Sequence, residues 1–141
     1  MMVTEAKRKT EGLAGKRVLV VEDDPSIAMG LRINLESEGY LVDLAADGER
    51  GLELARRESP DLMVLDLMLP RMDGYKVCRA LKFDERYRRI VIVILSARTG
   101  ETDRRLAFDL GADAYVTKPY DVRALVGDIR NRLGVAPGQA A

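Results

Sequence analysis

Residues 62–74 read Leu-Met-Val-Leu-Asp-Leu-Met-Leu-Pro-Arg-Met-Asp-Gly. Four apolar residues lead into the single carboxylate of Asp66, and a loop containing proline and glycine follows. An apolar run of this length is typical of a strand buried on both faces, as in a parallel sheet. Asp66 would then end a central strand, at the edge where open α/β sheets bind ligands. Taken alone, Asp66 is equally well explained as the cap of the following loop or helix.

The composition restricts the class of protein. A length of 141 residues allows one domain with a single core. Basic and acidic residues are equal in number, 23 of each, so bulk positive charge for nucleic-acid binding is lacking. The small basic cluster at residues 86–89 is interpreted as a solvated loop. The chain has no histidine, which excludes His-based metal sites and Ser-His triads.

The same composition suggests a compartment. Cys78 is the only cysteine, so an internal disulfide is excluded and a reducing compartment fits. Residues 1–17 are polar and mixed in charge, unlike a signal peptide, and no apolar run reaches the length of a membrane span. We therefore expect a soluble, cytoplasmic domain without membrane contact.

Apolar runs and helical periodicity alternate along the chain. They predict one domain over residues 16–134, between a flexible leader at 1–15 and a flexible tail at 135–141. Five strands that alternate with five helices imply right-handed βαβ crossovers and a parallel sheet covered on both faces, a doubly wound α/β fold. The fourth helix has a thin apolar face. The predicted strands are 18–21, 41–45, 62–66, 90–95 and 114–117, and the predicted helices are 25–38, 47–58, 74–82, 100–110 and 122–133.

Polar side chains stand where four of these strands end. They are Glu22 and Asp23, Asp66, Ser96 and Lys118. In a doubly wound sheet such ends converge beside the point where the strand order reverses. Three close carboxylates stay ionised only with a cation among them, and hard oxygen ligands suit Mg²⁺. The lysine and the serine are donors for phosphoryl oxygens.

Each of these residues has a plain structural explanation when taken alone. Glu22 or Asp23 suits a turn, Lys118 suits the surface, and Ser96 alone says nothing. Asp24 is interpreted as a helix cap rather than a ligand, because Pro25 suits the first helical position after it. Five chemically matched groups on four strand ends favour one shared site over five coincidences.

Four motifs lie at the ends of predicted strands: Val-Val-Glu-Asp-Asp-Pro at 20–25, Val-Leu-Asp-Leu-Met-Leu-Pro-Arg-Met-Asp-Gly at 64–74, Leu-Ser-Ala-Arg at 95–98, and Gly-Ala-Asp-Ala-Tyr-Val-Thr-Lys-Pro at 111–119. In this order they resemble the receiver domain of two-component response regulators. The resemblance extends over about residues 16–133 and implies a chemotaxis-regulator-like, flavodoxin-like fold with the strand order 2-1-3-4-5. The chain departs from the family pattern in two features, neither of which affects the chemistry. Glu22 stands where Asp is also common, and the strand at 90–95 lacks the proline that often precedes it.

The resemblance implies a phosphoacceptor rather than a metabolic enzyme. Asp66 would take a phosphoryl group from a phosphohistidine of a sensor histidine kinase or phosphotransfer protein. Mg²⁺ would be held by Asp23, Asp66 and the backbone carbonyl of Met68, with Glu22 acting mainly through water. Lys118 would pair with Asp66 and later with the phosphate.

Further roles follow from the same resemblance. Ser96 would hydrogen-bond a phosphoryl oxygen, and the peptide bond between Lys118 and Pro119 would be cis. Tyr115 would swing inward as Ser96 moves, which would alter the face made by the fourth helix, the fifth strand and the last helix. That face would control a partner or output domain, and it allows a dimer.

Two positions would set the lifetime of the aspartyl phosphate. Met68 and Arg98 would border the approach of water to the phosphoryl group. Neither side chain can act as a base, so slow self-dephosphorylation is expected.

Two other functions remain as alternatives. A phosphatase that forms an aspartyl phosphate would carry a second carboxylate two positions after the nucleophile, where this chain has Met68. A receiver-like interaction module would have lost the acceptor chemistry. The sequence leaves open the cognate kinase, the output, the oligomeric state, and whether the domain is stand-alone or part of a longer regulator. No direct nucleic-acid binding by this domain is expected.

Overall fold

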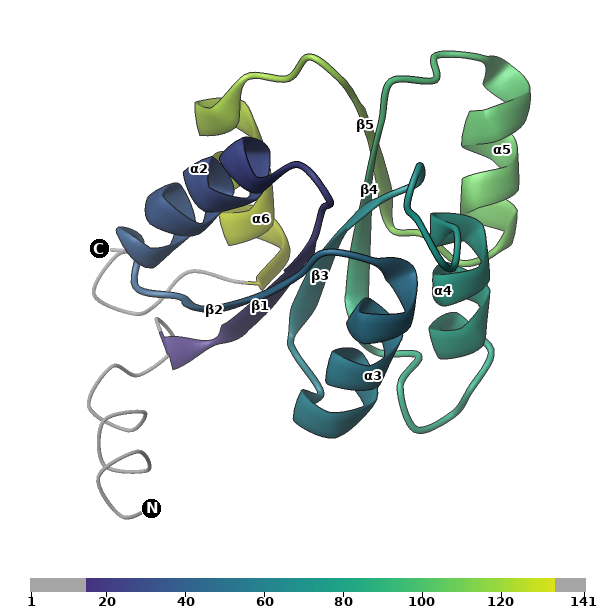
Figure 1. The fold of residues 1–141 in the computed structure, drawn as a ribbon, viewed down its shortest axis with the longest axis horizontal. Helices are drawn as coiled ribbons and strands as arrows, with labels where there is room; N and C mark the ends of the chain where they lie inside the picture. Colours follow the sequence, from purple (N-terminus) through teal and green to yellow (C-terminus); the bar gives the residue numbers. More distant parts are fainter. Residues whose placement is uncertain (1–14, 134–141) are drawn as a thin grey trace.

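The structure is a computed structural model, and it describes residues 15–133. Five parallel strands form one sheet in the order β2-β1-β3-β4-β5 (Figure 1). The doubly wound α/β fold and the strand order expected from the sequence are therefore confirmed. The predicted leader and tail, apart from residue 15, lie outside the described residues. The strands are β1 (Arg17–Val21), β2 (Leu41–Ala45), β3 (Leu62–Asp66), β4 (Val91–Ser96) and β5 (Ala114–Thr117).

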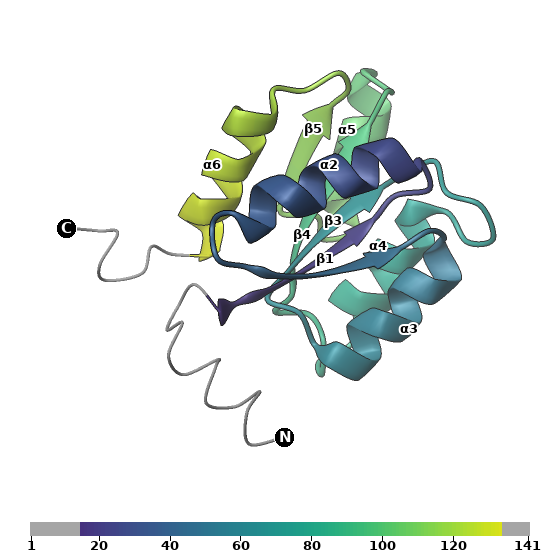
Figure 2. The same ribbon diagram turned by 60° about the vertical axis from the view of Figure 1, so that its left-hand side comes forward.

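Helices cover both faces of the sheet. One face carries α2 (Pro25–Glu36) and α6 (Val122–Leu133), and the other carries α3 (Gly48–Glu58), α4 (Gly74–Lys82) and α5 (Glu101–Asp109) (Figures 1 and 2). Each face has its own apolar cluster, and all five residues of β3 are buried between them. This position explains why β3 is a continuous apolar run without polar alternation.

Aspartate side chains cap four of the five helices. Asp24 accepts hydrogen bonds from the backbone N–H groups at the start of α2, as predicted, and Asp47 caps α3. Asp73 caps α4, and Asp121 accepts from two N–H groups at the start of α6. Such caps satisfy donors that the first helical turn leaves without partners.

The fourth helix along the chain, α5, differs from the others. α5 begins after Gly100 without a side-chain cap, and Ala107 is its only buried residue. Leu106 and Phe108 remain 42% and 44% exposed. The predicted thin apolar face is therefore observed, and α5 is held to the sheet by little buried surface.

Small differences from the sequence prediction occur at element ends. β4 begins at Val91 rather than at residue 90, and it includes Ser96. In α2, Ala28, Leu31 and Leu35 are buried, whereas Ile27 is only partly buried.

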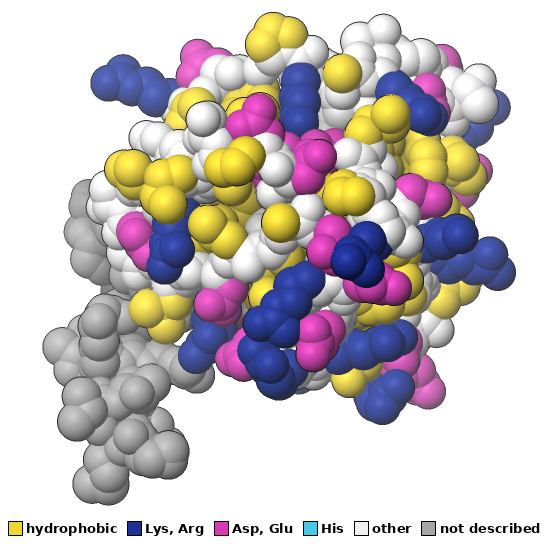
Figure 3. All heavy atoms as spheres, viewed as in Figure 1, with side chains coloured by type: hydrophobic (Ala, Val, Ile, Leu, Met, Phe, Trp, Pro, Cys, Tyr) yellow, Lys and Arg dark blue, Asp and Glu magenta, His cyan; other side chains and the backbone are white. Residues whose placement is uncertain are grey.

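Basic and acidic side chains are interspersed over the face of the molecule in Figure 3. In the part of the chain that the structure describes, each helix is too short or too polar to span a bilayer.

Candidate functional site at the carboxyl edge of the sheet

Strand register brings the acidic residues together. β1 and β3 pair in parallel with Val21 opposite Leu65, so the next residues, Glu22 and Asp66, emerge side by side. Asp23 follows Glu22 into the loop before α2. Because the carboxyl ends of parallel strands share one edge, residues 44 positions apart in the sequence become neighbours.

The same geometry adds the serine and the lysine. Asp66 pairs with Leu95, so Ser96 stands one residue further along β4. Ser96 pairs in turn with Thr117, and Lys118 follows directly. All five strand-end residues named from the sequence therefore lie at one edge of the sheet.

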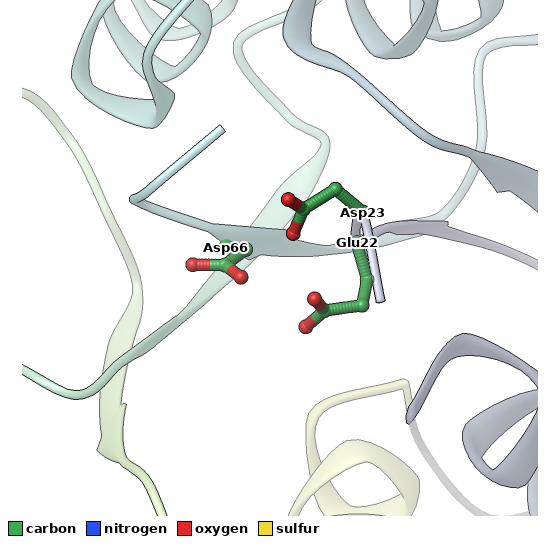
Figure 4. A group of neighbouring side chains, drawn as sticks. All are labelled: Glu22, Asp23 and Asp66. Atoms are coloured by element: carbon green, nitrogen blue, oxygen red, sulfur yellow. The ribbon is translucent and has the colours of Figure 1, made fainter. Parts of the chain in front are cut away.

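Three carboxylates form the acidic part of this site (Figure 4). Oxygens of Glu22, Asp23 and Asp66 all lie within 4.8 Å of one another. Glu22 and Asp66 are each 4% exposed, whereas Asp23 is exposed to solvent. A donor set of hard oxygens that is open to water on one side fits a hydrated divalent cation such as Mg²⁺.

Lys118 forms ion pairs with both buried carboxylates. Its Nζ lies 3.0 Å from Glu22 Oε1 and 2.9 Å from Asp66 Oδ2. Burial alone would lower the pKa of Lys118, but the hydrogen bonds and charges of Asp66 and Glu22 outweigh it and raise this pKa. Lys118 therefore stays cationic beside Asp66.

Burial has the opposite effect on the pKa of a carboxylic acid, here that of Glu22. It raises the pKa of Glu22, and the nearby charge of Asp66 adds to the increase, although hydrogen bonds from the Asp24 N–H and Lys118 oppose it. A bound cation would favour the ionised form of Glu22 and would compete with its proton.

The loop after β3 is held in a tight arrangement. The Met68 N–H donates to Asp66 Oδ1 at 2.9 Å, and Lys118 Nζ donates to Asp66 Oδ2, so both carboxylate oxygens of Asp66 accept a hydrogen bond. A Cβ at Gly74 would lie 2.6 Å from the Asp66 carbonyl oxygen, and one at Gly48 would lie 1.9 Å from the Met72 carbonyl oxygen. Glycine at both positions lets the loop pack against α3 and α4.

Arg98 connects the two predicted switch residues. Its backbone N–H donates to Ser96 Oγ at 3.0 Å, and its carbonyl accepts from the Tyr115 hydroxyl at 2.9 Å. Tyr115 is 7% exposed, so the inward position expected after phosphorylation is already present in the structure. The peptide bond between Lys118 and Pro119 is cis.

A hollow of about 540 Å³ opens beside the carboxylates. Asp23, Met68, Tyr75 and Arg98 line it together with parts of the loop after β3. Met68 is 54% exposed there. Met68 and Arg98, which were predicted to border the approach of water to Asp66, therefore face a space that is open to solvent.

Sequence reasoning missed two residues near this hollow. The Tyr75 hydroxyl donates to Asp103 Oδ1 at 2.8 Å, and Arg98 Nη1 donates to the same oxygen at 3.2 Å. Tyr75 lies on α4 and Asp103 on α5, 28 positions later. No short motif or helical spacing joins them, so the sequence alone carried no signal for this cluster.

Comparison with known proteins agrees with the fold. Residues 18–130 match the family model described as the response regulator receiver domain. The chain is 46% identical over 117 residues to the DNA-binding dual master transcriptional regulator RpaA of Synechocystis sp.. This aligned region covers 83% of this chain and 48% of RpaA. The chain is also 45% identical over 118 residues to the DNA-binding response regulator MtrA of Mycolicibacterium smegmatis, covering 84% of this chain and 50% of MtrA.

Solved structures show the same architecture. A CheY-like response regulator receiver domain protein from Methanospirillum hungatei superposes with a TM-score of 0.79 at 29% identity, over 84% of this chain and 94% of that one. The chain spans about half the length of the curated relatives and nearly all of this solved receiver. Because the family model matches residues 18–130, which hold nearly all of the described fold, the chain belongs to the response regulator receiver domain family.

Proposed function

We propose that this receiver domain is a phosphoacceptor switch in which Asp66 takes a phosphoryl group from a phosphohistidine of a sensor histidine kinase or phosphotransfer protein. The bond from phosphorus to the imidazole nitrogen breaks, and a bond to a carboxylate oxygen of Asp66 forms. The imidazole leaves and regains a proton from water. Response regulator receiver domains are signalling switches and not metabolic enzymes, so no turnover of a phosphomonoester is expected.

The observation that carries this proposal is the setting of Asp66. Asp66 is 4% exposed at the end of β3, and its carboxylate lies beside two other carboxylates and 2.9 Å from the Lys118 ammonium. A carboxylate that only capped a helix would have no need of a partly buried lysine and an acidic cluster. Asp73, not Asp66, caps the helix that follows.

The neighbouring residues have matching roles in the proposal. Asp23, Asp66 and the Met68 carbonyl would hold Mg²⁺, with Glu22 acting through water, and the ion would supply positive charge for the phosphoryl oxygens. Lys118 would exchange its contact with Asp66 for one with the phosphoryl group. Ser96 would donate its hydroxyl to a phosphoryl oxygen.

The direct test is the phosphorylation of the wild-type chain. Incubation with acetyl phosphate and Mg²⁺ should add one phosphoryl group, which peptide mass spectrometry should place on Asp66 and which hydroxylamine should remove. Chelation with EDTA before the reaction should prevent the addition. A phosphoryl group on a different residue, or none at all with Mg²⁺ present, would contradict the proposal.

The proposed output face consists of α5, β5 and α6. Because α5 buries only Ala107, a small bias is enough to shift its packing. We expect phosphorylation to draw Ser96 toward the phosphoryl group and to stabilise the inward Tyr115 through Arg98. This face would act on a partner, an output domain or a second copy of the chain. The relatives RpaA and MtrA bind DNA by name, and a DNA-binding output is one candidate for a longer protein.

Amide hydrogen exchange tests the proposed switch. Phosphorylation should change exchange rates across residues from about 99 to 121, because the shift would pass from Ser96 to α5 and β5. The comparison needs wild type with and without acetyl phosphate, followed by mass spectrometry of peptides. Changes confined to the peptides around Asp66 and Asp23 would show that no switch reaches this face.

The phosphorylated state is expected to persist for minutes or longer. Water must approach the phosphoryl group past Met68 and Arg98, and neither side chain orients water as a base. The double variant Met68→Asn, Arg98→Glu should lose phosphate faster, because an amide and a carboxylate can hold a water for attack. The decay of labelled protein in excess Mg²⁺ without kinase measures both rates. A wild-type lifetime of seconds, or equal rates, would contradict this assignment.

A further inference from the structure

Three side chains from separate elements meet at the rim of the hollow beside Asp66. Asp103 Oδ1 accepts from both the Tyr75 hydroxyl, at 2.8 Å, and Arg98 Nη1, at 3.2 Å. The Tyr75 hydroxyl also lies 3.4 Å from the Asp103 carbonyl oxygen. The cluster therefore joins the start of α4, the loop after β4 and the first turn of α5.

The cluster orients a cation that is otherwise free to move. The Arg98 side chain is 48% exposed, and a long exposed side chain samples many rotamers. Asp103 holds one end of its guanidinium, while the backbone of Arg98 is held by Ser96 and Tyr115. Arginine has five N–H donors, so one bond to Asp103 leaves others for an anion.

Tyr75 in turn orients Asp103. Burial and the hydrogen bond to Asp103 raise the pKa of Tyr75 to about 12, so the phenol keeps its proton and remains a donor. The same hydrogen bond, together with Arg98, lowers the pKa of Asp103, so its carboxylate stays ionised. The contact between the two is thus a hydrogen bond from a neutral phenol to a charged acceptor, the stronger kind.

We infer that Tyr75 and Asp103 are positioning residues that fix the Arg98 guanidinium at the rim of the hollow, where it binds the anionic phosphodonor before transfer to Asp66. Asp23 and Met68 line the same hollow, so a donor held by Arg98 lies beside the acidic cluster. This inference rests on the proposed function of Asp66. It adds the route by which the donor is captured, and it assigns roles to two residues outside the strand-end motifs.

Tyr75→Phe is the test variant because it removes one hydroxyl and leaves every charge in place. The measured quantity is the rate of phosphorylation of the full chain at increasing acetyl phosphate with saturating Mg²⁺. Freeing a side chain that must be ordered again on binding costs about 0.5–1.5 kcal/mol, so the initial slope of the rate against acetyl phosphate concentration should fall roughly two- to twelvefold. The rate at saturating donor should be unchanged, since no group at the reacting atoms is altered.

A double-variant comparison separates positioning from a merely structural role. Arg98→Ala should lower the initial slope, and adding Tyr75→Phe to it should have no further effect, because no guanidinium remains to be oriented. Tyr87→Phe, which also removes one phenol hydroxyl but lies in the connection between α4 and β4, is the matched control and should behave as wild type. Asp103→Glu keeps the charge but displaces the carboxylate, and it should lower the slope as Tyr75→Phe does.

A readout that needs no phosphorylation keeps the two proposals separable. Nitrogen-15 relaxation of the Arg98 Nε should report a restricted side chain in wild type and a mobile one in Tyr75→Phe. Failure of wild type to become phosphorylated would overturn the proposed function of Asp66. If wild type is phosphorylated, an unchanged slope in Tyr75→Phe and Asp103→Glu would overturn the inference, and so would a wild-type slope in Arg98→Ala. A Tyr75→Phe substitution that lowers the slope as much in the Arg98→Ala background as in wild type would overturn it as well.

Discussion

The Asp66→Asn variant is expected to lose phosphorylation completely while it keeps the fold. Asparagine has nearly the same shape as aspartate, but its amide is not a carboxylate nucleophile. No other acidic side chain of the cluster has the same setting, because Asp23 is exposed and Glu22 emerges from the neighbouring strand. Incubation with acetyl phosphate and Mg²⁺, followed by intact-mass measurement, should show no added phosphoryl group.

The stability of this variant provides the control. Lys118 keeps its contact with Glu22 at 3.0 Å, so its charge remains paired after the substitution. Removing Asp66 also removes one of three negative charges that repel one another when no cation is bound. The free energy of unfolding in urea, measured with EDTA, should therefore be equal to or higher than that of wild type. A variant that is still labelled to stoichiometry would show that Asp66 is not the acceptor.

Asp23→Ala is expected to have the second largest effect. Asp23 is the exposed member of the carboxylate cluster, so it is the member that a hydrated cation reaches from solvent. Loss of a metal ligand should lower the rate of Mg²⁺-dependent phosphorylation by about 100-fold or more. It should also remove the increase in melting temperature that Mg²⁺ gives to wild type, which is measured without any phosphodonor.

The adjacent Asp24→Ala variant is the matched comparison. Asp24 accepts from the backbone N–H groups of Ser26 and Ile27 at 2.9 and 3.3 Å, so its role is to cap α2. Its loss should cost about 1 kcal/mol of unfolding free energy and leave the effect of Mg²⁺ in place. If Asp24→Ala lost the response to Mg²⁺ and Asp23→Ala lost only stability, the two roles would be reversed.

Much of the fold could be predicted from the sequence because its signals are local. The apolar run that ends at Asp66 identified the central strand, and β3 has the predicted bounds. The Asp24-Pro25 pair identified the start of α2, since a cap and a proline at the first helical position act within a few residues. The alternation of strands and helices then left few topologies, because parallel crossovers have one hand.

The position of the candidate site could also be predicted, but only as the edge of the sheet where the carboxyl ends of the strands lie. A parallel sheet places all its carboxyl ends at one edge, so Glu22, Asp66 and Lys118 had to lie near one another once the sheet was accepted. The distances within the site follow from strand register and side-chain rotamers. The two bonds of Lys118 and the hydrogen bond from the Met68 N–H to Asp66 are therefore known only from the structure.

What only the tertiary structure decided lies between elements that are distant in sequence. The bonds of Asp103 with Tyr75 and Arg98 join three elements, and neither Tyr75 nor Asp103 stands at a strand end. The close approach of Gly48 to Met72 and the inward Tyr115 are of the same kind. The sequence determined the elements and the edge where the chemistry lies, because caps and apolar periods act over a few residues. The contacts around Arg98 depend on how packed helices are placed over the sheet, and no local pattern encodes that placement.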